Sequence, residues 1–534
     1  MATLTYSFPG GIYPNQYSPP LPTLDYNATF GELVDMDTAT RISASSTQVL
    51  FSLGNGLKIK LVGAGFAFDA DGYATAGKLS SIQVLQNDGT TAVLTMTDLS
   101  VPLEQFQDAA AGFDNWGLEE WLLNGADTFN GSAGDDTMEG RDGNDNLKGN
   151  GGDDFMTGGE GDDSYNGGAG FDVLSFQDAY YTQSAFRGIN LDASAGTVID
   201  PYGFSETFSN FEEYRGTQFA DVFLGSSANE EFMGLGGRDS INGGGGIDTV
   251  RYQRDTDRGG NLGVNVNLTT GVARDGFGTQ DTLKNIENVR GTEFADTIVG
   301  NSASNFLRGH AGNDSLNGAS GADQMRGGQG NDTYFVDSTG DVADETLDSG
   351  SGNDTVRSAI TFNLGSTTAI KGSVENLVLL GTGNTNGTGN ALNNTLNGNS
   401  GNNSLNGGDG NDVINGGLGN DTLTGSTGLD TFFFNTGPNS STNVDTIRGF
   451  TVADDTIRLE NGVFTAIVGT GTLTAAQFAA NATGTAADSD DRIIYETDTG
   501  KLFYDSNGSD SGGSVHFASI STSLGVTSAD FFVV

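Results

Sequence analysis

Aspartate recurs every nine residues along part of this chain, each time five positions after a glycine. The clearest run is Gly131, Gly140, Gly149, Gly158 and Gly167, followed by Asp136, Asp145, Asp154, Asp163 and Asp172. Carboxylates are hard anionic ligands that suit Ca²⁺, and glycine permits the tight turns that an ion-holding loop needs. The spacing therefore predicts a series of repeated calcium loops and not one catalytic centre.

The repeat has the form Gly-Gly-x-Gly-x-Asp-x-apolar-x and is almost unaltered at residues 416–424. Its first six residues predict a turn, and its last three predict a short strand whose one apolar residue faces a thin core. These nonapeptides resemble the repeats-in-toxin (RTX) family. The resemblance implies a parallel β-roll with two repeats per coil and several calcium ions between stacked turns.

The nine-residue register returns in three further blocks, which begin at Gly216, Gly291 and Gly389. Some acidic positions in these blocks are altered: Glu230 is one methylene longer, and Asn305, Asn394 and Asn403 are neutral. We expect those positions to bind calcium weakly or only to shape the roll. The predicted metal ligands are Asp136, Asp145, Asp154, Asp163, Asp172, Asp239, Asp248, Asp314, Asp323, Asp332, Asp412, Asp421 and Asp430.

Related inserts separate the blocks, since residues 210–221 and 285–296 match after a displacement of 75 residues. Their alternating apolar residues and Gly/Asp/Asn turns predict β-hairpins. The expected fold is all-β: roll segments interrupted by hairpins, with a small N-terminal β-domain and a C-terminal β cap. The expected segments are an N-terminal domain (1–123), repeat blocks (124–176, 216–252, 291–336, 389–434), inserts (177–215, 253–290, 337–388) and a C-terminal cap with a secretion signal (435–534).

Composition supports an elongated repeat protein whose core is thin. Hydrophobic residues make up 35% of the 534 residues, and the formal net charge is -46. Coulomb repulsion argues against nucleic acid and against insertion into an anionic membrane. Because stacked aspartates repel one another, we expect the roll to fold only when calcium is present.

Catalytic motifs are lacking in the sequence. It contains no cysteine and only two histidines, His310 and His516, so a cysteine nucleophile and a His-Glu-x-x-His zinc site are excluded. No Gly-x-Ser-x-Gly element occurs either. The sequence predicts that the protein is not an enzyme.

The two ends of the sequence bear on export. Residues 1–9 have neither a basic segment nor an apolar one, so no N-terminal signal peptide is expected. The ending Asp530-Phe-Phe-Val-Val534 is similar to the C-terminal signal of RTX proteins. That resemblance implies a type I ABC exporter as a partner and an extracellular or cell-surface location. A final strand at the edge of the C-terminal β-domain is compatible with the same residues.

The N-terminal segment indicates less about function than any other part of the sequence. Residues 48–62 predict a hairpin around Gly54-Asn-Gly56, and Asp69–Gly72 suggests a turn more strongly than a calcium loop. Trp116 and Trp121 predict a short helix that closes the open end of the roll, with stacking on a sugar as the alternative.

These observations predict a secreted calcium-binding protein with a structural or surface-associated role in a surface layer, matrix or adhesive coat, where it could self-assemble or contact cell-surface polysaccharide. The alternative is a carbohydrate-binding adhesin or a polysaccharide-modifying enzyme that acts through residues 1–123 or an insert. A membrane-active toxin is disfavoured because amphipathic helices are missing.

Overall fold

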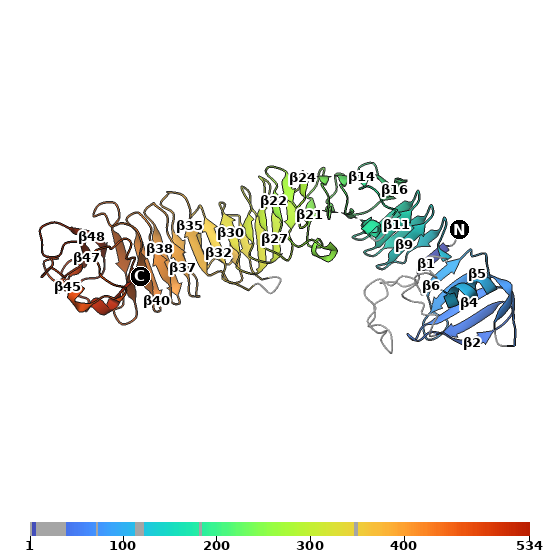
Figure 1. Ribbon diagram of the computed structural model, residues 1–534, viewed down its shortest axis with the longest axis horizontal. Helices are drawn as coiled ribbons and strands as arrows, with labels where there is room; N and C mark the ends of the chain where they lie inside the picture. The colour runs from blue at the N-terminus through green and yellow to red at the C-terminus, as the bar shows by residue number, and fades with distance from the viewer. Residues whose placement is uncertain (1–2, 7–38, 71–72, 113–121, 181–183, 347–350) are drawn as a thin grey trace. The chain divides into compact units, whose positions relative to one another are not determined.

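The computed structural model describes residues 3–6, 39–70, 73–112, 122–180, 184–346 and 351–534. The described chain is almost entirely β-structure, and most strands pair in parallel with the strand one coil away (Figure 1). It divides into two compact units. Unit 1 comprises Met1–Gly260 and Gly271–Ile286, and unit 2 comprises Asn261–Thr270 and Glu287–Val534.

Unit 1 begins with an antiparallel sheet in the order β2-β3-β4-β5-β6-β1. The elements are β1 (Thr3–Tyr6), β2 (Thr40–Ala44), β3 (Gln48–Ser52), β4 (Lys58–Phe68), β5 (Ala74–Leu85), β6 (Ala92–Thr97), β7 (Val101–Pro102) and α2 (Leu103–Gly112). Alternate residues such as Ile59, Leu61 and Ile82 are buried, as half-buried strands require. The hairpin predicted at 48–62 is confirmed by β3 and β4. The proline-rich opening, residues 71–72 and both tryptophans lie outside the described residues.

The coil of unit 1 stacks its strands in two parallel series. Its strands are β8 (Thr128–Asn130), β9 (Thr137–Asp142), β10 (Asn146–Gly151), β11 (Phe155–Glu160), β12 (Ser164–Ala169), β13 (Val173–Ser175), β17 (Glu213–Arg215), β18 (Val222–Leu224), β19 (Glu231–Met233), β20 (Ser240–Asn242) and β21 (Thr249–Arg251). Leu147 on β10 lies beside Phe129 on β8 and Tyr165 on β12, so residues 18 apart stack in register. The apolar residue of each repeat is buried, as predicted, and forms the thin core. Strand β1 also pairs in parallel with β8, which joins the N-terminal sheet to the first coil.

The first two inserts contain the predicted antiparallel pairs. Their elements are η3 (Gln177–Tyr180), β14 (Asn190–Asp192), β15 (Thr197–Ile199), β16 (Ser205–Ser209), η4 (Thr256–Arg258), β22 (Asn265–Asn267), β23 (Val272–Arg274) and β24 (Gln280–Lys284). Strand β15 pairs antiparallel with β14 and β16, and β23 pairs antiparallel with β24. Strands β16 and β24 then return in parallel beside β12 and β20. Each insert thus ends by rejoining the coil.

The third insert does not form the expected hairpin in its described residues. Its strands are β31 (Val342–Asp344), β32 (Thr355–Ser358), β33 (Phe362–Asn363), β34 (Ile370–Lys371), β35 (Asn376–Leu379) and β36 (Gly387–Thr388). All their pairings are parallel, including β30 with β32 and β32 with β35. The extra residues are taken up in the turns, so the coil continues without reversing.

The remaining strands of unit 2 complete this coil and its C-terminal cap. They are β25 (Asn288–Arg290), β26 (Thr297–Val299), β27 (Phe306–Ala311), β28 (Ser315–Asn317), β29 (Gln324–Gln329), β30 (Thr333–Val336), β37 (Thr395–Asn397), β38 (Ser404–Asp409), β39 (Val413–Asn415), β40 (Thr422–Thr427), β41 (Thr431–Phe434), β42 (Asp445–Arg448), β43 (Thr456–Leu459), β44 (Gly471–Thr472), β45 (Phe478–Asn481), β46 (Ile493–Glu496), β47 (Lys501–Asp505), β48 (Ser514–Ser519) and β49 (Phe531–Val533), with 3₁₀ turns η5 (Ala475–Gln477) and η6 (Ser528–Asp530). Strand β49 lies between β43 and β44, so the C-terminal strand is internal to its sheet and not at an edge. None of the helices among the described residues is long and apolar enough to span a membrane.

Candidate calcium sites

Each predicted ligand aspartate is buried in a turn and immediately precedes a strand. Their relative exposure is at most 5%: Asp136, Asp145, Asp154, Asp163, Asp172, Asp239, Asp248, Asp314, Asp323, Asp332, Asp412, Asp421 and Asp430. Carboxylates are almost never buried to this extent unless they are paired or bind a metal. Their burial marks the turns as sites at which negative charge must be compensated.

One hydrogen bond is repeated between the acidic positions of successive coils. The backbone N–H of Asp136 donates to Oδ1 of Asp154, and that of Asp154 donates to Oδ1 of Asp172, each at 2.8 Å. Opposite them in the coil, the N–H of Asp127 donates to Oδ1 of Asp145 at 2.6 Å. We call each such series of stacked carboxylates an acidic ladder. The ladder fixes Oδ1 and leaves Oδ2 to find another partner.

Most of the second carboxylate oxygens find no partner within the protein. Buried Oδ2 atoms that accept no hydrogen bond belong to Asp145, Asp154, Asp172, Asp239, Asp314, Asp323, Asp332, Asp412, Asp421 and Asp430. Two predicted ligands differ: Oδ2 of Asp136 accepts the N–H of Ser132 at 2.5 Å, and Oδ2 of Asp163 accepts the hydroxyl of Tyr165 at 3.2 Å. An unsatisfied buried charge is costly, whereas a cation beside it removes the penalty.

The same burial changes the protonation of the ladder when no metal is present. Burial, together with the smaller effect of neighbouring carboxylates, raises the pKa of Asp145, Asp154 and Asp314 to about 8. Burial also raises the pKa of Asp136 and Asp172 to about 6. A folded ladder at neutral pH must therefore take up either protons or a metal ion.

The turns fit calcium because they bring together two kinds of oxygen around a space that excludes side chains. A Cβ at Gly149 would lie 1.8 Å from Oδ2 of Asp154 and 2.3 Å from the carbonyl oxygen of Gly167 in the next coil. Carboxylate and carbonyl oxygens are the ligands that Ca²⁺ takes. The aspartates and turn carbonyls of stacked repeats would hold the ion, which supplies the positive charge that the ladder lacks.

The ladders continue through the inserts and into the C-terminal cap with acids that were not among the predicted ligands. Asp332 N–H donates to Oδ1 of Asp354 at 2.8 Å, and Asp239 N–H donates to Oδ1 of Asp281 at 3.0 Å. The acids in equivalent positions are Glu212, Asp281, Asp341, Asp354, Glu375, Asp445 and Asp455. A sequence signal existed for several of them, because Asp-Thr-Val/Ile-Arg occurs at 248–251 and again at 354–357, 445–448 and 455–458.

The neutral positions close their turns with amide hydrogen bonds. Nδ2 of Asn305 donates to the carbonyl oxygen of Glu287 at 2.7 Å, and Nδ2 of Asn403 donates to that of Thr385 at 2.6 Å. Asn394 makes the corresponding bond at 3.0 Å. The amide nitrogen thus bonds to a carbonyl of the preceding coil, and these turns are satisfied without a cation.

We expect Asn403→Asp to convert an amide-closed turn into a calcium-dependent one. The substitution removes the donor to Thr385 and buries a charge, so calcium-free stability should fall by about 1–3 kcal/mol. Calcium should restore most of the loss. Thermal unfolding with and without calcium measures this difference. The control is Asn435→Asp, which makes the same charge change at an exposed position. Equal calcium dependence of the two variants would contradict the assignment.

Acidification is expected to favour folding of the calcium-free chain. The folded-state pKa of Asp145, Asp154 and Asp314 is about 8, above the ordinary 3.8, so protons bind more tightly to the folded state. This stabilisation is complete below about pH 3.8 and is lost as pH rises through about 8. Circular dichroism of EDTA-treated protein should therefore gain β-sheet signal between about pH 8 and 4. A signal that is flat across this range would count against the buried ladder.

A polar cavity of about 470 Å³ lies on unit 1, between repeat strands β9 and β11 and the first insert. Its lining includes Glu139, Phe155, Asp178, Tyr202 and Arg258. The hydroxyl of Tyr202 donates to Oδ2 of Asp178 at 3.0 Å. Burial raises the pKa of Asp178 to about 6. The cavity combines two aromatic rings, of Phe155 and Tyr202, with charged and polar groups of both signs.

Comparison with known proteins agrees with the repeats. The family described as RTX calcium-binding nonapeptide repeat (4 copies) matches residues 123–155, 139–174, 215–258, 290–325, 299–334 and 388–423. The search of curated proteins returned no match. Among solved structures, the chain is similar to the crystal structure of extracellular lipase LipA from Serratia marcescens, with 12% identity and a TM-score of 0.16. The similarity covers 77% of this chain and 40% of the lipase, so this chain spans well under half of that protein.

Proposed function

Because the chain belongs to the RTX family of calcium-binding nonapeptide-repeat proteins, we propose that it is secreted, folds on calcium outside the cell, and has a structural or surface-associated role. Its repeats bind Ca²⁺ through a thin parallel β-roll. The observation that carries the proposal is the row of buried, unpartnered carboxylate oxygens in both units. Such a ladder is unstable where calcium is scarce and stable where calcium is abundant.

Secretion as an unfolded chain is consistent with the placement of the C-terminal residues. Phe531 and Val533 are buried in β49, which pairs with strands on both sides. A type I exporter that reads Asp530–Val534 would therefore have to do so before this strand pairs. Low cytosolic calcium would keep the ladders from forming until the chain reaches the outside.

A structural role in a surface layer, matrix or adhesive coat suits a chain in which coils stack on one another within each unit. Each coil contacts mainly its neighbours, so stability depends on ions and stacking and not on one large core. In this proposal the repeats bind calcium and contribute no catalytic group. Self-assembly would require the net charge of -46 to be reduced, and bound calcium does this.

A calcium titration of purified, EDTA-treated full-length protein tests the proposal. Circular dichroism should report folding, and light scattering recorded on the same sample should report growth of particles. Magnesium, which holds its water shell more tightly, serves as the control and should have little effect. Folding without particle growth would leave the calcium response intact and count against an assembled coat.

The polar cavity of unit 1 favours carbohydrate binding as a second candidate function. Phe155 and Tyr202 can stack on a sugar ring, and Asp178 can accept hydroxyl hydrogen bonds. A glycan array probed with the calcium-loaded protein and with Asp178→Asn tests this. Binding that survives the substitution would exclude the cavity as the site, and loss of binding would support the adhesin alternative.

A further inference from the structure

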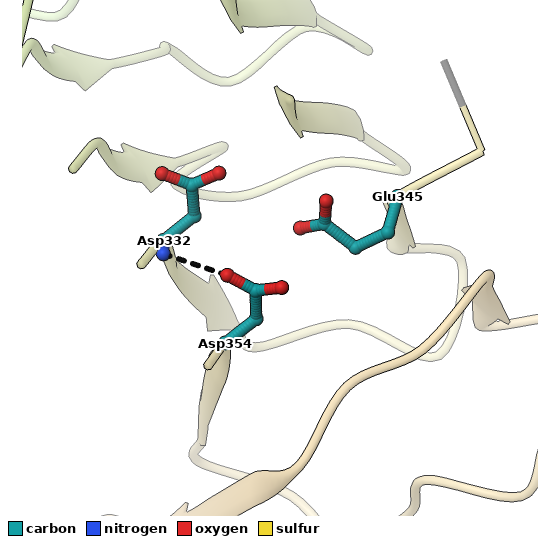
Figure 2. Close-up of side chains that lie close together, drawn as sticks. All are labelled: Asp332, Glu345 and Asp354. Atoms are coloured by element: carbon teal, nitrogen blue, oxygen red, sulfur yellow. Dashed lines mark hydrogen bonds between the residues drawn. The ribbon is translucent and has the colours of Figure 1, made fainter. Parts of the chain in front are cut away.

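Three buried carboxylates converge in unit 2 at the start of the third insert. They belong to Asp332, Glu345 and Asp354, and one oxygen from each lies within 4.8 Å of the others. Figure 2 shows Glu345 extending toward the two aspartates. Their relative exposures are 1%, 6% and 2%. Solvent therefore does little to screen the repulsion among them.

Glu345 stands where the repeat would have a glycine. Strand β29 pairs in parallel with β31 so that Gln324 lies beside Val342, which places position 345 one coil beyond Gly327. A Cβ at Gly327 would lie 2.0 Å from Oδ2 of Asp332. The same position in the next coil carries a carboxylate side chain. The insert thus places an acidic side chain at a position where the repeat has glycine and therefore no side chain.

Hydrogen bonds orient the three groups but leave two oxygens unsatisfied. Asp332 N–H donates to Oδ1 of Asp354 at 2.8 Å, and the Tyr334 hydroxyl donates to Oε1 of Glu345. Tyr334 is itself held by the backbone N–H of Gly327 at 2.8 Å. Oδ2 of Asp332 and Oε2 of Glu345 are buried and accept no hydrogen bond. Both belong to side chains that face the shared space.

Among the residues that the structure describes, no ion pair with a basic side chain compensates this charge. Three oxygen-only ligands from separate turns suit a hard divalent cation of the size of calcium. Glu345 adds a third carboxylate to the stacked pair Asp332 and Asp354, so this cluster carries one more acidic group than a stacked pair of ladder aspartates.

We propose that Asp332, Glu345 and Asp354 hold a Ca²⁺ ion that fastens the third insert to the preceding repeat block, and that this site fills at lower calcium than the two-aspartate sites. Affinity in calcium sites rises with the number of charged ligands when the ligands are already positioned. The inference stands independently of the surface role proposed above, since it concerns one ion and three residues.

Terbium, which replaces calcium and emits when a nearby tyrosine is excited, provides the test in full-length protein. The emission that Tyr334→Phe loses relative to wild type reports the ion beside Tyr334. Tyr165, which lies next to Asp163, is unchanged and still excites terbium in both proteins. Glu345→Gln should shift this component to about tenfold higher terbium concentration or more. Equilibrium dialysis with calcium should show the matching loss of the tightest binding. Glu104→Gln, an exposed glutamate on α2, is the charge-matched control and should change neither readout.

Circular dichroism in saturating calcium checks that the variants fold. Glu345→Gly, which restores the repeat glycine, gives a second reading if Glu345→Gln does not fold, and the same shift is expected. An isotherm unchanged in either folded variant would overturn the proposal and leave Glu345 as a neutral acid bonded to Tyr334. If neither variant folds, Tyr334→Phe decides: emission lost at terbium concentrations below those that fill the two-aspartate sites would support the site, and emission that is unchanged, or lost only at higher concentrations, would overturn the proposal.

Discussion

Removal of calcium with EDTA is expected to abolish most of the β-sheet circular dichroism of this protein. Each ladder site would retain buried carboxylates with no counterion, at a penalty of several kcal/mol per ion. A folded domain has a net stability of only about 5–15 kcal/mol, so a few empty sites in one unit exceed it. The repeat coils should therefore unfold together at neutral pH.

The N-terminal sheet should survive this treatment because its core is of a different kind. Leu61, Ile82 and Val84 are buried among other apolar side chains, and no acidic ladder crosses strands β2–β6. Limited proteolysis in EDTA should leave a resistant fragment that contains residues 40–97. Excess calcium added after EDTA should restore the signal, and magnesium should not. Unchanged circular dichroism in EDTA would refute the calcium dependence of the roll.

Gly149→Ala is expected to weaken both calcium binding and folding of the first repeat block. The new Cβ would lie 1.8 Å from Oδ2 of Asp154 and 2.3 Å from a carbonyl oxygen of the next coil. Both atoms would have to move, and both belong to the groups that would hold the ion. Overpacking of this kind costs about 1–3 kcal/mol before any loss of metal is counted. The calcium concentration at the folding midpoint should therefore rise.

Gly151→Ala provides the matched control because it lies on the same strand, β10. Its Cβ would meet no atom closer than 3.7 Å, which is an ordinary contact. Any difference between the variants thus reports the crowded position and not the lower flexibility of alanine. Similar folding midpoints for Gly149→Ala and Gly151→Ala would show that the space beside Asp154 is not needed for calcium.

The nine-residue period predicted the turns, the buried apolar residues and the aspartates that precede the strands, and the resemblance to the RTX family implied the parallel roll. Each of these features depends only on positions within one repeat and on the stacking of repeats 18 residues apart. Leu147, for example, must face the core because its neighbours in the repeat are polar or glycine. The sequence also predicted the hairpin at 48–62, whose turn contains glycine between alternating apolar residues.

What the period could not predict is how the chain returns to the coil after an insert. Asp354 and Asp281 join the ladders at separations of 22 and 42 residues from their partners, which no fixed spacing anticipates. The third insert also alternates apolar and polar residues, yet it stays parallel because Asp354 and Glu375 hold it in the ladder. Glu345 was not predicted as a metal ligand because the repeat has glycine at that position. Its proximity to Asp332 and Asp354, which suggests the role, is seen only in the structure.

The variable separations along the ladders have a consequence for how such a chain can change in length. Intervals of 18, 22, 24, 25 and 42 residues all end with a carboxylate accepting the same backbone hydrogen bond. Extra residues are therefore tolerated between two successive carboxylates of a ladder. The condition is that the second acid and the strand after it return to the register of the coil. The exposed bend between β14 and β15 is one place where a foreign peptide could be inserted. The calcium-binding coils on either side of it would keep their register.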